Sequence, residues 1–166
     1  MRTLSPKGLS FITQEEGFVD HVYLDGEKDR HGNPIPGKDK GKASIGFGHL
    51  VRPGETFPEK ITRQQGMALF NKDLARFVAA VNALGVDLTQ NQFDALVSLA
   101  FNIGLGPGSF PSSVVVKHVC AGDMAAAAAN FWQWRRSGAD KSIDPRLVAR
   151  RERERFLFLT PDEEAP

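Results

Sequence analysis

The sequence predicts an α+β fold in which a long helix joins a small β-containing N-terminal lobe to a larger helical lobe, leaving a cleft between them. Between residues 19 and 50 the apolar residues alternate as in strands, whereas from residue 62 onwards they recur at helical spacing. The 166 residues, 41% hydrophobic and 25% charged, suit one folded domain with a sizeable core. The expected parts are a small lobe at about 12–61, a linking helix at about 62–84, a helical lobe at about 85–160 and an acidic tail at 161–166.

The first helix is expected to begin after Ser5, because serine is a favoured N-cap and Pro6 suits the first helical position. Gly17 is expected to end it, since glycine readily adopts the left-handed conformation found just after helices. Glu16 lies four residues after Ile12 and therefore shares its apolar face. This places an acidic side chain at a helix end, beside the core.

A β-rich stretch is expected next. Residues 19–25 alternate with the period of a strand and place Asp25 on its polar face. Residues 43–50 are expected to form a second strand, or the end of a small hairpin, because two glycines interrupt them. The polar segment between them, Gly26 to Lys42, has the glycines and prolines of a loop or irregular hairpin.

Helix starts in the second half are marked by capping residues. Thr62 with Gln65, and Thr89 with Gln92, have the spacing of capping boxes, in which each partner satisfies a free backbone donor of the first turn. The pattern is helical from here to the end of the chain. The later helical segments are expected over 114–120, after Asp123, and from Asp144 to about Leu159.

Composition excludes several classes of function. The net charge of +1 gives no overall signature of nucleic-acid binding, and no run approaches the roughly 20 apolar residues of a membrane helix. Cys120 is the single cysteine, so an intrachain disulfide and a cysteine-rich zinc site are impossible. The four histidines form no zinc motif, which disfavours a zinc-dependent amidase or peptidase. The basic residues of 135–155 indicate either a solvated helix face or a positive rim for an acidic polymer.

Two carboxylates and a hydroxyl stand in order near the N-terminus: Glu16, Asp25 and Ser44. Hydrolysis of a glycosidic bond requires one carboxyl group to protonate the leaving oxygen. A second carboxyl, with polar help, must steady the attacking water or the charge that develops on the sugar ring. The trio therefore indicates an enzyme that cleaves carbohydrate.

Ordered blocks of sequence surround and follow this trio, within residues 16–49, 61–73, 92–104 and 147–154. In register, they resemble the phage-type lysozymes, the muramidase endolysins of tailed bacteriophages, which are glycoside hydrolases. The resemblance covers nearly the whole chain. It implies a lysozyme-like fold with the substrate cleft between the lobes, and cleavage of the β-1,4 bond between N-acetylmuramic acid and N-acetylglucosamine in peptidoglycan.

By this resemblance Glu16 is the general acid, while Asp25 and Ser44 hold and activate the attacking water on the other face of the sugar. We expect inversion at the anomeric carbon, since that geometry leaves room for the water. No cofactor and no metal are implied. The chain departs from the family in carrying Ser44 where threonine is usual, and in the longer Gly26 to Lys42 segment, which we expect to form a hairpin turn able to reach over the cleft.

Four further residues are singled out near the expected site. His49 is expected to be structural and to pair with Asp73, from the family register of both positions. Asn102 is a candidate substrate contact, because an amide both donates and accepts hydrogen bonds. Arg151 is a candidate for substrate binding in the cleft, and a structural ion pair is the equal alternative. Two tryptophans at 132 and 134 are more typical of core than of sugar platforms.

The resemblance also implies a biological setting. We expect a monomer made in the host cytoplasm that reaches the wall after a holin permeabilises the membrane, and that causes host lysis without stable membrane insertion. Two other functions stay open: a muramidase used as an antibacterial effector, and a non-catalytic peptidoglycan-binding module. The presence of both Glu16 and Asp25 argues against the second.

Overall fold

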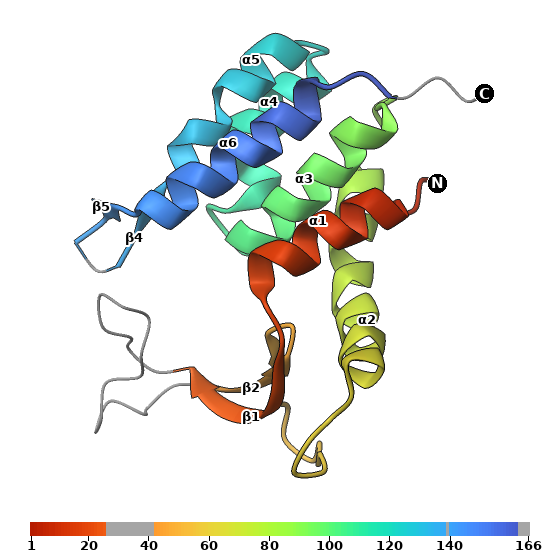
Figure 1. Ribbon diagram of the computed structural model, residues 1–166. Helices are drawn as coiled ribbons and strands as arrows, with labels where there is room; N and C mark the ends of the chain where they lie inside the picture. The colour runs from red at the N-terminus through yellow and green to blue at the C-terminus, as the bar shows by residue number, and fades with distance from the viewer. Residues whose placement is uncertain (26–41, 139, 163–166) are drawn as a thin grey trace. The chain divides into compact units, whose positions relative to one another are not determined.

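The computed structural model describes residues 1–25, 42–138 and 140–162 (Figure 1). By internal contacts the chain separates into two compact units. The small unit is Thr13–Asp73, and the helical unit combines Met1–Ile12 with Leu74–Pro166. One division therefore falls inside the first helix and the other inside the long second helix. The lobe boundaries and the cleft expected from the sequence stay predictions.

The small unit contains a three-stranded antiparallel sheet with the order β1-β2-β3. Its strands are β1 (Val19–Asp25), β2 (Lys42–Gly46) and β3 (His49–Leu50). The predicted strand and hairpin are confirmed. Gly46, just before the two-residue turn between β2 and β3, has a φ of 69°, and Gly48, within that turn, has a φ of 80°, values that glycine adopts readily. The predicted loop from Gly26 lies outside the described residues, except for Lys42 at its end.

The helix α1 (Pro6–Glu16) has the predicted ends. The Ser5 hydroxyl accepts a hydrogen bond from the Gly8 amide at 2.9 Å, as an N-cap residue does. Gly17 follows with φ of 70°, a value that ends the helix and turns the chain into the sheet. The local sequence thus fixes Glu16 as the last helical residue.

Aromatic rings form the core of the small unit. The Phe47 ring lies 5.2 Å from that of Phe18 and 5.3 Å from that of Phe70, centroid to centroid. The Arg63 guanidinium lies 5.0 Å from the centroid of Phe47, in the range of a cation–π contact. A Cβ atom at Gly66 would come within 2.6 Å of the Phe18 ring, so the absence of a side chain there admits the aromatic cluster.

Helices α2 to α6 follow the sheet. Their bounds are α2 (Arg63–Asn82), α3 (Gln90–Ile103), α4 (Val114–Cys120), α5 (Met124–Ala129) and α6 (Pro145–Leu159). Both predicted capping boxes are present: Thr62 exchanges hydrogen bonds with Gln65 before α2, and Thr89 with Gln92 before α3. Because their side chains satisfy the free amides of the first turn, these residues set where each helix begins.

The core of the helical unit centres on α3, which packs against α6 (Figure 1). Every residue of α3 from Phe93 to Ala100 is buried. Two aromatic residues extend this core, because the rings of Phe131 and Phe158 lie 5.5 Å apart. In the described part of the chain, no helix combines the length and the apolar character needed to cross a bilayer.

The prediction of helix from residue 62 to the end is wrong at one place. The hairpin of β4 (Arg136–Ser137) and β5 (Ser142–Ile143) interrupts the helices there, while two short 3₁₀ helices, Phe110–Ser112 and Phe131–Trp134, lie between the α-helices. In this hairpin Gly138 and Lys141 have positive φ, 75° and 52°, which no right-handed helix accommodates. Strands of two residues carry no periodicity, so the sequence pattern cannot reveal them.

Candidate active site

All three predicted catalytic residues lie in the small unit. Glu16 is the last residue of α1 and is half-buried, Asp25 is the last residue of β1, and Ser44 sits in β2 with 5% of its surface exposed. The unit thus contains one acid at a helix end, one acid position at a strand end and one hydroxyl on the neighbouring strand. Their predicted roles stay predictions.

The strand register relates two of these positions. Tyr23 pairs with Ser44, and Asp25 pairs with Lys42. Because residues two apart along a strand share a face, position 25 and Ser44 are diagonal neighbours on one face of the β1–β2 pair. The Asp25 side chain itself lies outside the described part of the structure. A buried hydroxyl diagonal to an acid position suits the holding of one small molecule, such as water.

His49 anchors the hairpin that carries Ser44. Its Nδ1 lies 2.8 Å from Oδ2 of Asp73, so the pairing expected from the sequence is present. Its Nε2 lies 3.1 Å from Oε2 of Glu55, and the same oxygen accepts a 2.8 Å hydrogen bond from the Arg52 amide. Since His49 pairs with Ile45 in the sheet, the residue next to Ser44, this cluster holds the β2–β3 hairpin against α2.

Sequence reasoning missed Glu55. The Arg52 amide, followed by His49, lowers the pKa of the Glu55 carboxyl from its usual range, because both donate hydrogen bonds that favour its charged form. Glu55 stands in a polar stretch with no strand or helix period, so only its three-residue separation from Arg52, typical of a turn, signals a local contact. His49 therefore lies between two carboxylates, of which one was predicted.

The other two predicted residues lie in the helical unit. Arg151 has no exposed side-chain surface, and its Nε lies 2.9 Å from Oε2 of Glu154. Its Nη2 donates to Oδ1 of Asn102 at 2.9 Å, and Asn102 is exposed. Of the two interpretations left open for Arg151, these contacts support the ion pair. Substrate binding by Arg151 and Asn102 stays a prediction, and sequence reasoning missed Glu154.

A sequence model of the family described as phage lysozyme matches residues 13–154, most of the chain. The chain belongs to the phage lysozyme family. An endolysin of Acyrthosiphon pisum secondary endosymbiont phage 1 is 35% identical, over 93% of this chain and 97% of the relative. An endolysin of Bacillus phage PZA is 36% identical over 93% of this chain. The chain spans about half the length of the two Bacillus phage endolysins that it matches.

Solved structures confirm the lysozyme-like α+β fold. The muramidase domain of SpmX from Asticaccaulis excentricus has a TM-score of 0.77 and 32% identity, and the match covers 97% of this chain and all of that one. An endolysin from Escherichia coli O157:H7 phage FAHEc1 has a TM-score of 0.78 and 32% identity, covering 95% of this chain and 94% of that one. This member of the phage lysozyme family therefore shares its architecture with both.

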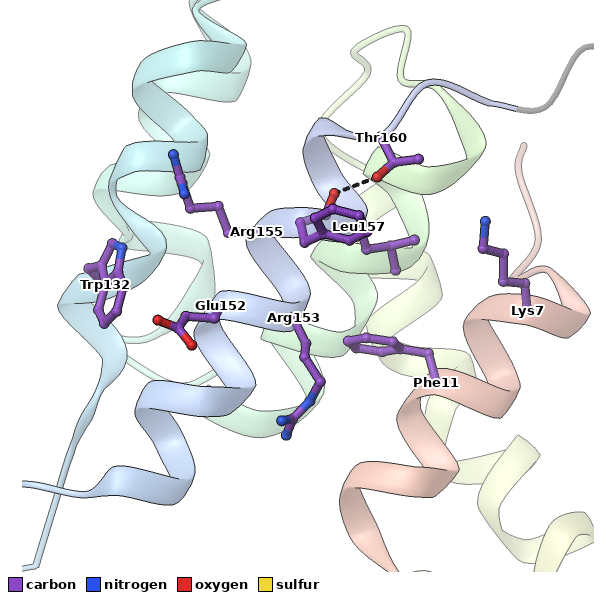
Figure 2. A pocket seen from close by; sticks show the side chains of 9 residues that line it. Lys7, Phe11, Trp132, Glu152, Arg153, Arg155, Leu157 and Thr160 are labelled. Carbon is purple, nitrogen blue, oxygen red and sulfur yellow. Dashed lines mark hydrogen bonds between the residues drawn. The ribbon is translucent and has the colours of Figure 1, made fainter.

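The helical unit of this phage lysozyme family member also carries an apolar groove of about 600 Å³ between α1 and α6 (Figure 2). Phe11 and Trp132 line it together with Phe156, whose residue surface is 76% exposed. Arg153 and Arg155 also line the groove beside Glu152, whereas Arg150 and Arg151 are buried, so the two interpretations of the basic residues, a solvated face and a positive rim, both stay open. None of the predicted site residues lines this groove.

The described residues contain no group of three histidine, cysteine or acidic side chains placed to hold a metal ion. The three predicted catalytic positions of this phage lysozyme family member offer two carboxyl groups and a hydroxyl. This is the set that general acid–base hydrolysis of a glycoside uses.

Proposed function

We propose that the chain is a phage endolysin that hydrolyses the β-1,4 bond between N-acetylmuramic acid and N-acetylglucosamine in bacterial peptidoglycan. The observation that carries the proposal is the joint placement of Glu16, Asp25 and Ser44 in one compact unit, inside the region matched to the phage lysozyme family. The endolysin relatives and the muramidase domain of similar fold support it.

Each member of the trio has a separate role in this proposal. Glu16 protonates the glycosidic oxygen as the bond breaks. Asp25 accepts a proton from the attacking water, and the Ser44 hydroxyl helps to hold that water, which the diagonal register of the two positions supports. Attack by water from the face opposite the leaving group inverts the anomeric carbon. The enzyme is therefore an inverting glycosidase.

Substrate contacts come from the helical unit in this proposal. Asn102 offers an exposed amide to the glycan, and Arg151 supports it from the buried side. In the small unit, Ser44 supplies the hydroxyl of the usual threonine without its methyl group, so its rotamer is less restricted. His49 and Asp73 support the hairpin and take no part in the chemistry.

The biological setting is part of the proposal. The chain acts as a monomer, is made in the host cytoplasm and reaches the wall after a holin permeabilises the membrane. The names of the phage relatives, which are endolysins, support this setting. No cofactor takes part.

The test is an assay of the purified protein on isolated peptidoglycan beside two variants. Glu16→Gln keeps the shape of the side chain but cannot deliver a proton, so we expect the rate to fall about 1,000-fold. Glu15→Gln is the matched control, since it makes the same change one residue earlier in α1 and should retain the wild-type rate. New reducing ends are identified by borohydride reduction and mass analysis.

New N-acetylmuramic acid ends that disappear in Glu16→Gln support the proposal. N-acetylglucosamine ends, free amino groups or an active Glu16→Gln variant contradict it. Proton NMR of the first products reads the stereochemistry, and we expect the α-anomer of a β-bond cleaved with inversion. Binding of peptidoglycan without cleavage identifies a non-catalytic module. A cognate immunity protein that blocks the activity identifies an antibacterial effector.

A further inference from the structure

A buried carboxylate joins α6 to α3 in the helical unit. Glu154 has no exposed surface, and its Oε1 accepts hydrogen bonds from the Ser98 hydroxyl at 2.7 Å, from Nε of Arg150 at 3.0 Å and from Nη2 of Arg151 at 3.1 Å. Its Oε2 lies 2.9 Å from Nε of Arg151. Arg151 therefore donates one hydrogen bond to Oε1 through Nη2 and lies at ion-pair distance from Oε2 through Nε, so the position of its guanidinium depends on the carboxylate.

This cluster is a costly way to join two helices. Burial raises the pKa of the Glu154 carboxyl, while the charges of Arg151 and Arg150 oppose that shift. Well-packed apolar side chains of similar volume often stabilise a core as much as a buried ion pair does. Stability alone therefore does not account for three charged side chains in a core, and their fixed geometry can act on a neighbouring side chain.

The neighbour is Asn102, near the end of α3. Nη2 of Arg151 has two hydrogens, one directed at Oε1 of Glu154 and the other at Oδ1 of Asn102, at 2.9 Å. Arginine only donates hydrogen bonds, so the oxygen of the amide must face it. The NH₂ group of Asn102 is then directed away from Arg151, on an exposed residue. An asparagine without this partner presents its oxygen or its nitrogen with little preference.

We propose that Glu154 is a positioning residue that, through Arg151, fixes the Asn102 amide with its N–H groups available to an acceptor oxygen of the glycan. Of the oxygens on an N-acetylated sugar, the acetamido carbonyl is the strongest neutral acceptor, so Asn102 recognises that group. This inference rests on the proposed peptidoglycan hydrolysis. It assigns to the site a donor whose orientation is set by a residue that never touches substrate.

The test is a double-mutant cycle on the hydrolysis of isolated peptidoglycan, with kcat and KM measured well below every thermal midpoint. Glu154→Gln keeps the shape but releases Arg151, and Asn102→Ala removes the donor. We expect each to lower kcat/KM about tenfold, and the double variant also about tenfold rather than 100-fold, because both changes remove one interaction.

Asp94→Asn is the matched control. Asp94 is equally buried in α3, and its carboxylate accepts hydrogen bonds from the Ser5 amide at 3.1 Å and from Gln90 at 2.9 Å. The acid-to-amide change there should lower the thermal midpoint but leave kcat/KM unchanged. Should Glu154→Gln fail to fold, Ser98→Ala takes its place in the cycle, since it removes one support of the same carboxylate without exposing a charge.

A hundredfold loss in the double variant overturns the inference, because Glu154 then acts independently of Asn102. Wild-type kcat/KM in Glu154→Gln overturns it as well. A wild-type chain that releases no N-acetylmuramic acid ends contradicts the proposed function itself, which the wild-type sample reads separately from the cycle. A tenfold loss in each single variant and in the double variant supports the inference.

Discussion

Two of the charged clusters that the structure describes, one in each unit, pair carboxylates with imidazole or guanidinium groups but differ in their access to water. The His49 cluster in the small unit has side chains that are 6% exposed at His49, 14% at Asp73 and 36% at Glu55. The Glu154 cluster in the helical unit is 0% exposed at Glu154 and Arg151. If a contact is lost in the His49 cluster, water can therefore hydrogen-bond to the group left behind. In the Glu154 cluster it cannot.

This difference separates what each cluster does. In the Glu154 cluster, a charge whose partner is removed stays buried and keeps its full desolvation cost, so the loss of one member destabilises the others. In the His49 cluster, water screens the charge that has lost its partner, and the charges of its members follow the pH of the solvent. The His49 cluster is thus suited to tolerate change while it holds a hairpin, and the Glu154 cluster to hold one fixed geometry.

The largest expected effect on stability comes from removing the carboxylate of the Glu154 cluster. Glu154→Ala leaves Arg150 and Arg151 buried without their carboxylate, and we expect the free energy of unfolding to fall by about 3–5 kcal/mol. Urea denaturation followed by circular dichroism measures it. Phe158→Leu, a volume change in the same core without loss of charge, is the control. A loss below about 1 kcal/mol would show that water reaches the cluster.

A smaller effect on stability is expected from a change in the His49 cluster. Asp73→Ala removes the acceptor of the His49 ring, and we expect a loss of about 1–2 kcal/mol, typical of one partly buried hydrogen bond. Asp73→Asn retains an acceptor oxygen and should lose less. Thermal and urea unfolding of the two variants at pH 7 decide the point. If the two variants lose equal stability, charge rather than hydrogen bonding holds the ring.

The smallest expected effect is confined to the pH dependence. Because the pKa of Glu55 is lower in the folded chain than in the unfolded one, its contribution to stability is present above the ordinary value of 4.5 and is lost as the pH falls through the folded value. Glu55→Gln should therefore flatten the curve of stability against pH below about pH 4.5. Parallel curves for the variant and the wild type would refute this assignment.

The sequence predicts what is decided locally. Helix starts at Thr62 and Thr89 were predictable because a side chain and an amide three residues apart settle them. Glu154 was not, because it stands in a run of alternating charges that is typical of a solvated face, and only packing against α3 buries it. The β4–β5 hairpin was missed for the same reason as most turns, since backbone conformation at one or two residues creates it.

The candidate site divides in the same way. The order and spacing of Glu16, Asp25 and Ser44 indicated their chemistry, and the strand register of two of them follows from the hairpin. Glu154 stands at helical spacing from Arg150 and Arg151, but the same spacing occurs on solvated helix faces, so only the packing shows that this pair is buried. Glu55 lies in a polar stretch without a strand or helix period, and its contact with His49 follows from the fold. Residues that act on other residues are found from contacts, whereas residues that act on substrate are found from chemistry.

The helical unit combines residues 1–12 with residues 74–166, so its first segment is synthesised well before the segment it packs against. The first residues are held by partners made much later: Asn82 bonds the Arg2 backbone, and Gln90 the Thr3 carbonyl. A ribosome therefore releases the start of α1 long before anything exists to fix it. The helix start cannot bond Asp94 until residue 94 has been synthesised, so the helix that carries Glu16 gains this anchor only after the whole small unit has been made.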